Sequence, residues 1–187
     1  MNDSTIMNTG VVRISYANIW APKAIQEGQE PKYSVSLLIP KSDKKTLNMM
    51  NSIIESLKQN VSAKNGGKLP PRFKLPLRDG DTDEAKADDK NYAGHYFVNA
   101  TAKKQPGIVD RNRQTIIDKG TVYSGCYCIA NINFYIFNNN GSKGIACGIN
   151  HLMKVRDGGH LDGRKSAEEA FAEIVFDDVD DFDELLA

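Results

Sequence analysis

The sequence predicts a mainly β protein with one principal helix, in which about five strands form a small closed barrel that is followed by an acidic tail. Three observations predict this class. Segments rich in β-branched and aromatic residues recur along the chain, one segment alone has helical spacing, and acidic residues gather at one end. We expect a domain in residues 1–165 and a disordered tail in residues 166–187.

The first two strands are expected over residues 10–20 and 32–40. GVVRISYANIW alternates loosely, whereas KYSVSLLIP alternates regularly and places Tyr33, Val35, Leu37 and Ile39 on one face. Because only a polar loop separates the two segments, they are predicted to pair as a hairpin.

Residues 42–61 change to the helical period. Their apolar side chains fall on one stripe, formed by Leu47, Met50, Ile54, Leu57 and Val61. Ser42 or Asp43 can cap the start, and the NGG sequence at residues 65–67 can end the helix. Residues 66–92 contain three prolines and many charges, which predicts a long loop of the kind that is usually functional or mobile.

The second half is rich in strand signals. Strands are expected over residues 94–102, 107–110, 114–118, 124–137 and 145–155, and the last two are joined by Asn/Gly-rich residues typical of a hairpin. A barrel closes so few strands without leaving long edges. An oligonucleotide-binding (OB) barrel fits the strand count, although here the helix follows the second strand rather than the third.

The strand at residues 124–137 has two different faces. The face expected in the core is apolar throughout and comprises Cys126, Cys128, Ala130, Ile132, Phe134 and Ile136. The opposite face mixes aromatic and amide side chains and comprises Tyr127, Ile129, Asn131, Asn133, Tyr135 and Phe137. Strand 94–102 repeats the pattern: Tyr96, Val98 and Ala100 are predicted to face inward, and His95, Phe97 and Asn99 outward.

Charge is segregated along the chain. The protein has 24 Lys and Arg and 24 Asp and Glu, yet nine of the acids lie in residues 166–187. The remaining 15 acids face 24 bases, which gives residues 1–165 a net charge of about +9. A basic body of this kind predicts a polyanionic partner.

Aromatic and amide side chains on a sheet with basic flanks are typical of a single-stranded nucleic-acid platform, because any base can stack on a ring and any phosphate can pair with a cation. The predicted nucleic-acid-binding residues are Arg13, Trp20, Lys32, Arg72, Lys74, Arg78, Phe97, Lys103, Lys104, Arg111, Arg113, Tyr127 and Tyr135. The alternative for each aromatic is ordinary packing, and for each Lys simple solvation. The combination of features favours a single-stranded nucleic acid as the partner, without membrane contact and with self-association on the bound strand as a further possibility.

The acidic tail suggests regulation. A tethered polyanion can occupy a basic groove until nucleic acid displaces it, and is then free to bind other proteins. The residues predicted to contact such partners are Asp177, Asp178, Asp180, Asp181, Phe182, Asp183 and Glu184. The alternatives are a solubilising end and a short helix over residues 166–176.

Catalytic and metal sites are weakly supported. Asp79, Asp81 and Asp83 are the candidates for a metal-dependent nuclease, but they lie on a predicted loop rather than on rigid elements. The three cysteines lack an evident fourth zinc ligand other than His151, and no phosphate-cradling glycine motif is present. We therefore expect no enzyme activity, metal or cofactor. The polar N-terminus, the absence of a long apolar run and the few cysteines predict a protein of a reducing cytoplasm.

Several motifs resemble a family of phage-encoded single-stranded DNA-binding proteins, first catalogued as a phage domain of unknown function. They are PKYSVSLLIPKSD, LPLRDGD, YAGHYFVNATAKKQPGIVD, YSGCY and NGSKGIACGINHLMKVRDG, in this order within residues 10–165. The resemblance implies an OB-type fold and sequence-independent coating of single strands during phage replication or recombination. It also implies an acidic C-terminus that recruits replication enzymes.

Overall fold

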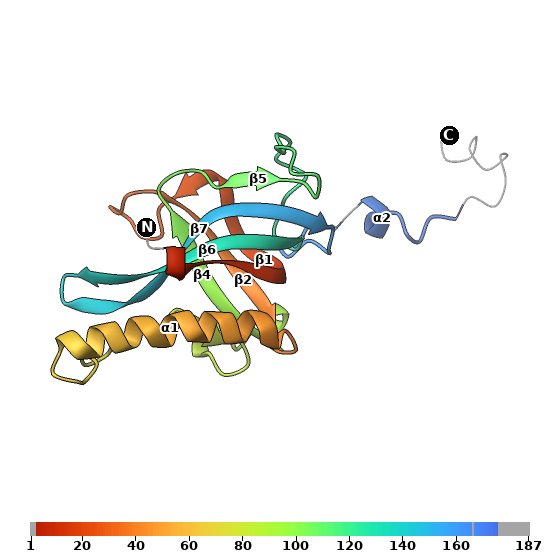
Figure 1. Cartoon of the computed structure of the whole chain (residues 1–187). Helices are drawn as coiled ribbons and strands as arrows, with labels where there is room; N and C mark the ends of the chain where they lie inside the picture. Colours follow the sequence, from red (N-terminus) through yellow and green to blue (C-terminus); the bar gives the residue numbers. More distant parts are fainter. Residues whose placement is uncertain (1–2, 166, 176–187) are drawn as a thin grey trace.

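Five strands pair in a ring (Figure 1). In the computed structural model, which describes residues 3–165 and 167–175, they are β1 (Ile6–Lys23), β2 (Lys32–Pro40), β4 (His95–Ala102), β6 (Tyr127–Asn139) and β7 (Ser142–Arg156). The hydrogen-bonded order β4-β2-β1-β6-β7 closes where β4 meets β7 in parallel, while the other neighbours are antiparallel. The predicted mainly β, five-stranded barrel is therefore confirmed, as are the hairpins β1–β2 and β6–β7.

The remaining elements are short, with one exception. The strands β3 (Leu77–Asp79) and β5 (Gly107–Val109) extend the sheet beside β4 and β7. The exception is α1 (Lys44–Lys64), whereas α2 (Ala167–Ala170) has a single turn. Three 3₁₀ turns complete the described part: η1 (Asp3–Thr5), η2 (Glu84–Lys86) and η3 (Lys90–Tyr92). No helix in this part is long and apolar enough to cross a membrane.

The barrel interior follows the predicted alternation. Cys128, Ala130, Ile132 and Phe134 of β6 are buried, as expected, and meet Val35, Leu37, Val98 and Ala100 from the opposite wall. Ile136 was predicted in the core but is 45% exposed, because the β6–β7 hairpin projects beyond the barrel (Figure 1). The apolar inner face of a strand is thus buried only as far as the barrel extends.

The helix α1 closes one side of the barrel through its predicted stripe, in which Leu47, Met50, Ile54 and Leu57 are buried. Its N-cap is Asp43, whose carboxylate accepts a hydrogen bond from the Thr46 amide at 3.1 Å. The Thr46 hydroxyl in turn accepts a hydrogen bond of 2.8 Å from the Gly10 amide of β1. Glycine is required there because a side chain at residue 10 would meet the Asp43 carboxylate. The cap therefore fixes the helix on the strand as well as starting it.

Two predicted strands differ from the structure. Residues 114–118 do not form a strand, and only Thr115 pairs, in a single bridge to Val109. The Asp110 carboxylate accepts the Asn112 and Gln114 amides at 2.8 and 3.0 Å, so these residues form a turn instead. The strand predicted from residue 124 begins at Tyr127, because Gly125 adopts a φ of +119° before it.

A second, smaller apolar cluster lies outside the barrel, where Leu38, Tyr92 and Phe97 are fully buried. We call this the covered cluster. The Tyr92 ring meets the Phe97 ring edge-on at 4.9 Å, and its hydroxyl donates to the Ser36 hydroxyl at 3.0 Å. Asp83 and Asp89 cap the 3₁₀ turns η2 and η3, which belong to the segment that covers this cluster. The long loop predicted over residues 66–92 therefore carries short ordered turns that cover part of the sheet.

Candidate nucleic-acid interface

A groove of about 610 Å³ lies over the outer face of β1. Four chain segments that are distant in sequence form it: the second half of β1, residues 89–91, residues 119–124 and residues 161–164. Its wall includes the aromatic side chains Tyr16, Trp20 and Tyr123, which we call the groove aromatics, and the cations Lys23, Lys119 and Arg164. Asp89 and Asp162 are the acids in the same wall.

Tyr16 reaches the groove because β1 is irregular at this point. The register with β2 shifts between Ser15 and Asn18, and Tyr16 has a φ of +45°, in the left-handed region that non-glycine residues seldom adopt. The irregularity turns the side chain outward, so that it is 58% exposed. The Lys86 ammonium lies 4.3 Å from the ring centroid. Strained backbone that displays a large ring is typical of a binding site.

Trp20 is the second aromatic side chain of the groove wall. Its indole N–H donates to the Val122 carbonyl at 3.0 Å, which ties β1 to the segment before β6. The Gln105 amide donates to the Ile19 carbonyl at 3.2 Å, so the chain after β4 also meets this end of β1. The indole is therefore fixed in orientation while part of its surface remains accessible.

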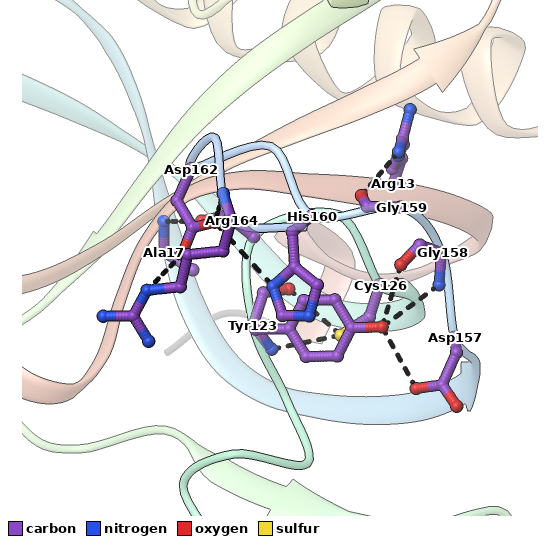
Figure 2. Close-up of polar contacts among 11 residues, drawn as sticks. Arg13, Ala17, Tyr123, Cys126, Asp157, Gly158, Gly159, His160, Asp162 and Arg164 are labelled. Atoms are coloured by element: carbon purple, nitrogen blue, oxygen red, sulfur yellow. Dashed lines mark hydrogen bonds and ion pairs between the residues drawn. The ribbon is translucent and has the colours of Figure 1, made fainter. Parts of the chain in front are cut away.

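Tyr123 is anchored by the chain segment that follows β7 (Figure 2). Its ring stacks on the His160 ring with centroids 3.9 Å apart and planes 13° from parallel. Its hydroxyl donates to the Gly158 carbonyl at 2.8 Å. Burial raises the pKa of this hydroxyl, so it remains a protonated donor at neutral pH.

The segment at residues 157–161 is fastened to the barrel through backbone groups. Arg13 donates to the Gly125 carbonyl at 3.1 Å and to the Gly159 carbonyl at 2.8 Å (Figure 2). Residues 125 and 158 must be glycine, because a side chain at either would collide with the backbone opposite. The Leu161 amide also donates to the Ser124 carbonyl at 2.9 Å. As a result, Arg164 lies in the groove wall immediately before the acidic tail begins.

The family of this chain follows from its similarity to a known protein family. The model of the family described as Enterobacter phage Enc34, ssDNA-binding protein, matches residues 5–184. The chain belongs to this family. The resemblance inferred from the sequence motifs is therefore confirmed.

Relatives agree with this assignment. "Putative protein p50" of Acyrthosiphon pisum secondary endosymbiont phage 1 is 32% identical over 164 residues, which cover 81% of this chain and 84% of that protein. The single-stranded DNA-binding protein from bacteriophage Enc34, solved in complex with ssDNA, is similar with a TM-score of 0.74 and 26% identity, over 84% of this chain and 90% of that one. The gp2.5 protein of bacteriophage T7 shares the fold, with a TM-score of 0.59 and 14% identity over 92% of this chain and 96% of that one.

In this member of the Enc34 family, the predicted site residues of this part of the chain are divided between the groove wall, the β1–β2 hairpin and the loops that flank β5. Trp20 is in the groove wall. Lys32 pairs with Lys23 across the β1–β2 hairpin, and Lys103 lies 3.8 Å from Glu30 of the same hairpin. Lys104, Arg111 and Arg113 are exposed in the loops before and after β5. Lys23, Lys119, Tyr16 and Tyr123 were missed, since they come together only through the fold.

Phe97 corrects the predicted platform. Its ring is fully buried in the covered cluster, and the Arg78 guanidinium lies 5.1 Å from the ring centroid. Arg78 also pairs with Asp83 at 2.7 Å. The outward direction of Phe97 is as predicted, but an accessible ring is not, because the loop that carries Tyr92 covers it.

Arg13 and Tyr127 make contacts with other residues of the chain. The Tyr127 ring has the Arg13 guanidinium at 5.6 Å and the Arg156 guanidinium at 4.0 Å from its centroid. Arg72, Lys74 and Tyr135 are exposed but belong to another region, near the β6–β7 hairpin, where the Lys74 amide donates to the Lys143 carbonyl at 3.0 Å. The structure thus divides the predicted residues among several regions. The predicted tail contacts, residues 177–184, lie outside the described residues.

The acidic residues of the LPLRDGD region are paired with cations rather than open to a metal. Lys41 lies 2.8 Å from Asp79 and 2.7 Å from Asp81. Hydrogen bonds from Lys41 lower the pKa of both carboxyls, and these bonds raise the pKa of Lys41. Within residues 3–165 and 167–175, no group of three or more His, Cys, Asp or Glu side chains is placed to hold a metal ion. The three cysteines are free and buried.

Proposed function

We propose that this protein binds single-stranded DNA without sequence preference and coats it during phage replication or recombination, in the cytoplasm of the host bacterium and without catalysing a reaction. The observation that carries the proposal is the groove on β1, which combines three aromatic side chains with three cations on the barrel of an Enc34-family chain. A solved relative in that family, the Enc34 protein, is in complex with ssDNA. A coating protein needs no nucleotide hydrolysis, because selective binding to single strands shifts the equilibrium from duplex to separated strands.

In this mechanism, bases stack on the groove aromatics and phosphates meet the surrounding lysines. Tyr16 offers the most exposed ring of the three, and stacking on an aromatic contributes about 1–3 kcal/mol per base. Lys23 and Lys119 in the groove wall, with Lys32, Lys103 and Lys104 beside it, hold phosphates and release counterions. Both interactions tolerate any base, which accounts for binding without sequence preference.

We further propose that the acidic tail competes for the groove and, once displaced, recruits replication proteins. The segment at residues 157–164 supports this because it delivers the chain to the groove wall just before residue 166. Nine acids tethered at this point have a high effective concentration beside the groove cations. Long DNA outcompetes the tail because it presents more phosphates than the tail has carboxylates.

The test is a titration of fluorescently labelled dT, rU and duplex oligonucleotides at two salt concentrations, with and without Mg²⁺ or Mn²⁺. We expect tight dT binding that weakens with salt and leaves the oligonucleotide intact. Absence of dT binding even in dilute buffer would overturn the proposal. Metal-dependent shortening of the strand would establish the nuclease alternative at Asp79, Asp81 and Asp83 instead.

A further inference from the structure

A second cavity lies at the opposite end of the molecule from α2 (Figure 1). It has a volume of about 250 Å³ and is bounded by the last turn of α1, residues 65–73 and the β6–β7 hairpin. In Figure 1 the hairpin and the C-terminal end of α1 lie on one side of the barrel, and α2 lies on the other. We call this cavity the hairpin pocket.

The walls of the hairpin pocket are held together by backbone hydrogen bonds. Lys74 donates its amide to the Lys143 carbonyl and accepts from the Ile145 amide, at 3.0 and 2.9 Å, so the loop is fastened to the hairpin. This approach requires Gly144, since a side chain at residue 144 would press on the Lys74 backbone and on the Phe137 ring. The inner wall consists of Val61, Pro70, Phe73, Ile136 and Phe137.

The rim of the pocket is strongly basic. Lys64 and Lys143 line it, and Lys68, Arg72 and Lys74 are exposed on the loop that forms one wall. The sequence contains no acid between Glu55 and Asp79, nor between Asp118 and Asp157, so no carboxylate from these stretches offsets the charge. An apolar cavity with a basic rim is complementary to an apolar side chain that is flanked by carboxylates.

The chain itself contains such a ligand. Phe182 is preceded by Asp180 and Asp181 and followed by Asp183 and Glu184, whereas Phe176 has directly adjacent acids on its C-terminal side only. We propose that the hairpin pocket receives Phe182 from the acidic tail of a second copy of this protein, with the flanking acids against the rim lysines. On a strand carrying several copies, each tail then docks on its neighbour.

Distance favours a neighbour over the same chain. The 15 residues of β7, about 50 Å long at roughly 3.3 Å per residue, run from the hairpin to Arg156, and residues 157–165 lie between that end and the tail. The 17 residues from Lys165 to Phe182 span at most about 60 Å when fully extended, and a flexible chain of that length averages only about 23 Å. A tail would therefore have to be almost straight to reach its own pocket around the barrel.

A neighbour on the same DNA removes this constraint. Copies bound in one orientation along a strand place the tail end of one beside the hairpin end of the next, a head-to-tail contact that can repeat. Confinement on the strand raises the effective concentration to the millimolar range, where a weak contact becomes occupied. This arrangement rests on the proposed DNA binding, and it gives cooperative coating without a separate dimer interface.

The first test locates Phe182 directly. The full-length protein carries p-benzoylphenylalanine at position 182, light and heavy isotopic copies are mixed, and the mixture is irradiated on poly(dT) and on an oligonucleotide that holds one copy. We expect light–heavy cross-links from residue 182 to residues 60–73 or 136–143 on poly(dT) only. DNA binding is measured by anisotropy in the same sample, so failure to bind DNA counts against the proposed function alone. Bound DNA with cross-links confined to one chain, directed to the groove, or absent would overturn the docking proposal.

The second test uses the ratio of apparent affinities for poly(dT) and for the one-copy oligonucleotide. Phe182→Ala should lower this ratio about tenfold, as expected for an apolar anchor, and Lys143→Glu about threefold, as expected for an exposed ion pair. Lys45→Glu, an exposed lysine near the other end of α1, is the matched control and should leave the ratio unchanged. Combining Lys143→Glu with Asp183→Lys should restore part of the ratio. A Lys143→Glu variant that weakens binding to the one-copy oligonucleotide would instead assign this lysine to DNA.

Discussion

Two aromatic clusters lie outside the barrel of this protein, and they differ in their exposure to solvent. The covered cluster on β2 and β4 is closed by Tyr92, whereas the groove aromatics on and beside β1 remain partly open. Lys86 lies between them, 4.3 Å from the Tyr16 centroid and 4.7 Å from the Tyr92 centroid. An outward ring on a strand is accessible to a ligand only where no loop packs on it.

The covered cluster should respond to mutation in stability rather than in DNA affinity. Phe97→Ala removes a fully buried ring and should lower the free energy of unfolding by about 3–5 kcal/mol. Urea denaturation followed by circular dichroism would show a lower midpoint at unchanged slope. Tyr16→Ala is the control and should change stability by less than about 1 kcal/mol. If Phe97→Ala instead retained full stability and lost dT affinity, the two clusters would have exchanged roles.

The groove aromatics should show the reverse behaviour. Tyr16→Ala removes the most exposed ring of the three and should weaken dT binding by about 1–3 kcal/mol, while Tyr16→Phe keeps the ring and should bind like the parent. Anisotropy with a labelled dT oligonucleotide measures both. Normal binding by a folded Tyr16→Ala variant would place the stacking surface elsewhere.

The same contrast explains what could be predicted from the sequence. The inner faces of β2, β4 and β6 follow a strict period of two, so Leu37, Val98 and Ile132 could be placed in the core from their spacing alone. The accessibility of outer residues depends on partners distant in the chain. Nothing local to Phe97 indicates that Tyr92 covers it, and nothing in RISYANIW marks the register shift that exposes Tyr16. The binding cations could be predicted only from their charge, which carries no information on position in the fold. For this reason the prediction placed Arg72 and Lys74 in one site with residues at the other end of the barrel.

The acidic tail, as a competitor for the groove, should affect binding at the groove aromatics and leave the covered cluster unchanged. Deleting residues 166–187 should tighten binding to a one-copy dT oligonucleotide about fivefold at low salt, in the range of ordinary coupling between sites. The gain should disappear at high salt, where the Debye length falls to about 3 Å. A full-length chain with the tail acids replaced by Asn and Gln should behave like the deletion. Equal affinities at low ionic strength would remove the competitive role of the tail.

The smallest expected effect concerns a single phosphate contact in the groove. Lys119 lies in the groove wall and is exposed, so Lys119→Ala should reduce the slope of log affinity against log salt by about 0.7, the value for one contact with a single strand. Lys45→Ala, on α1 and outside the groove wall, is the control and should leave the slope unchanged. The slope is informative because it counts phosphates and is insensitive to stacking. A change in affinity at constant slope would mean that Lys119 orders the loop around Val122 and Tyr123 instead of meeting the DNA, and the electrostatic part of binding would then belong to the lysines of the β1–β2 hairpin.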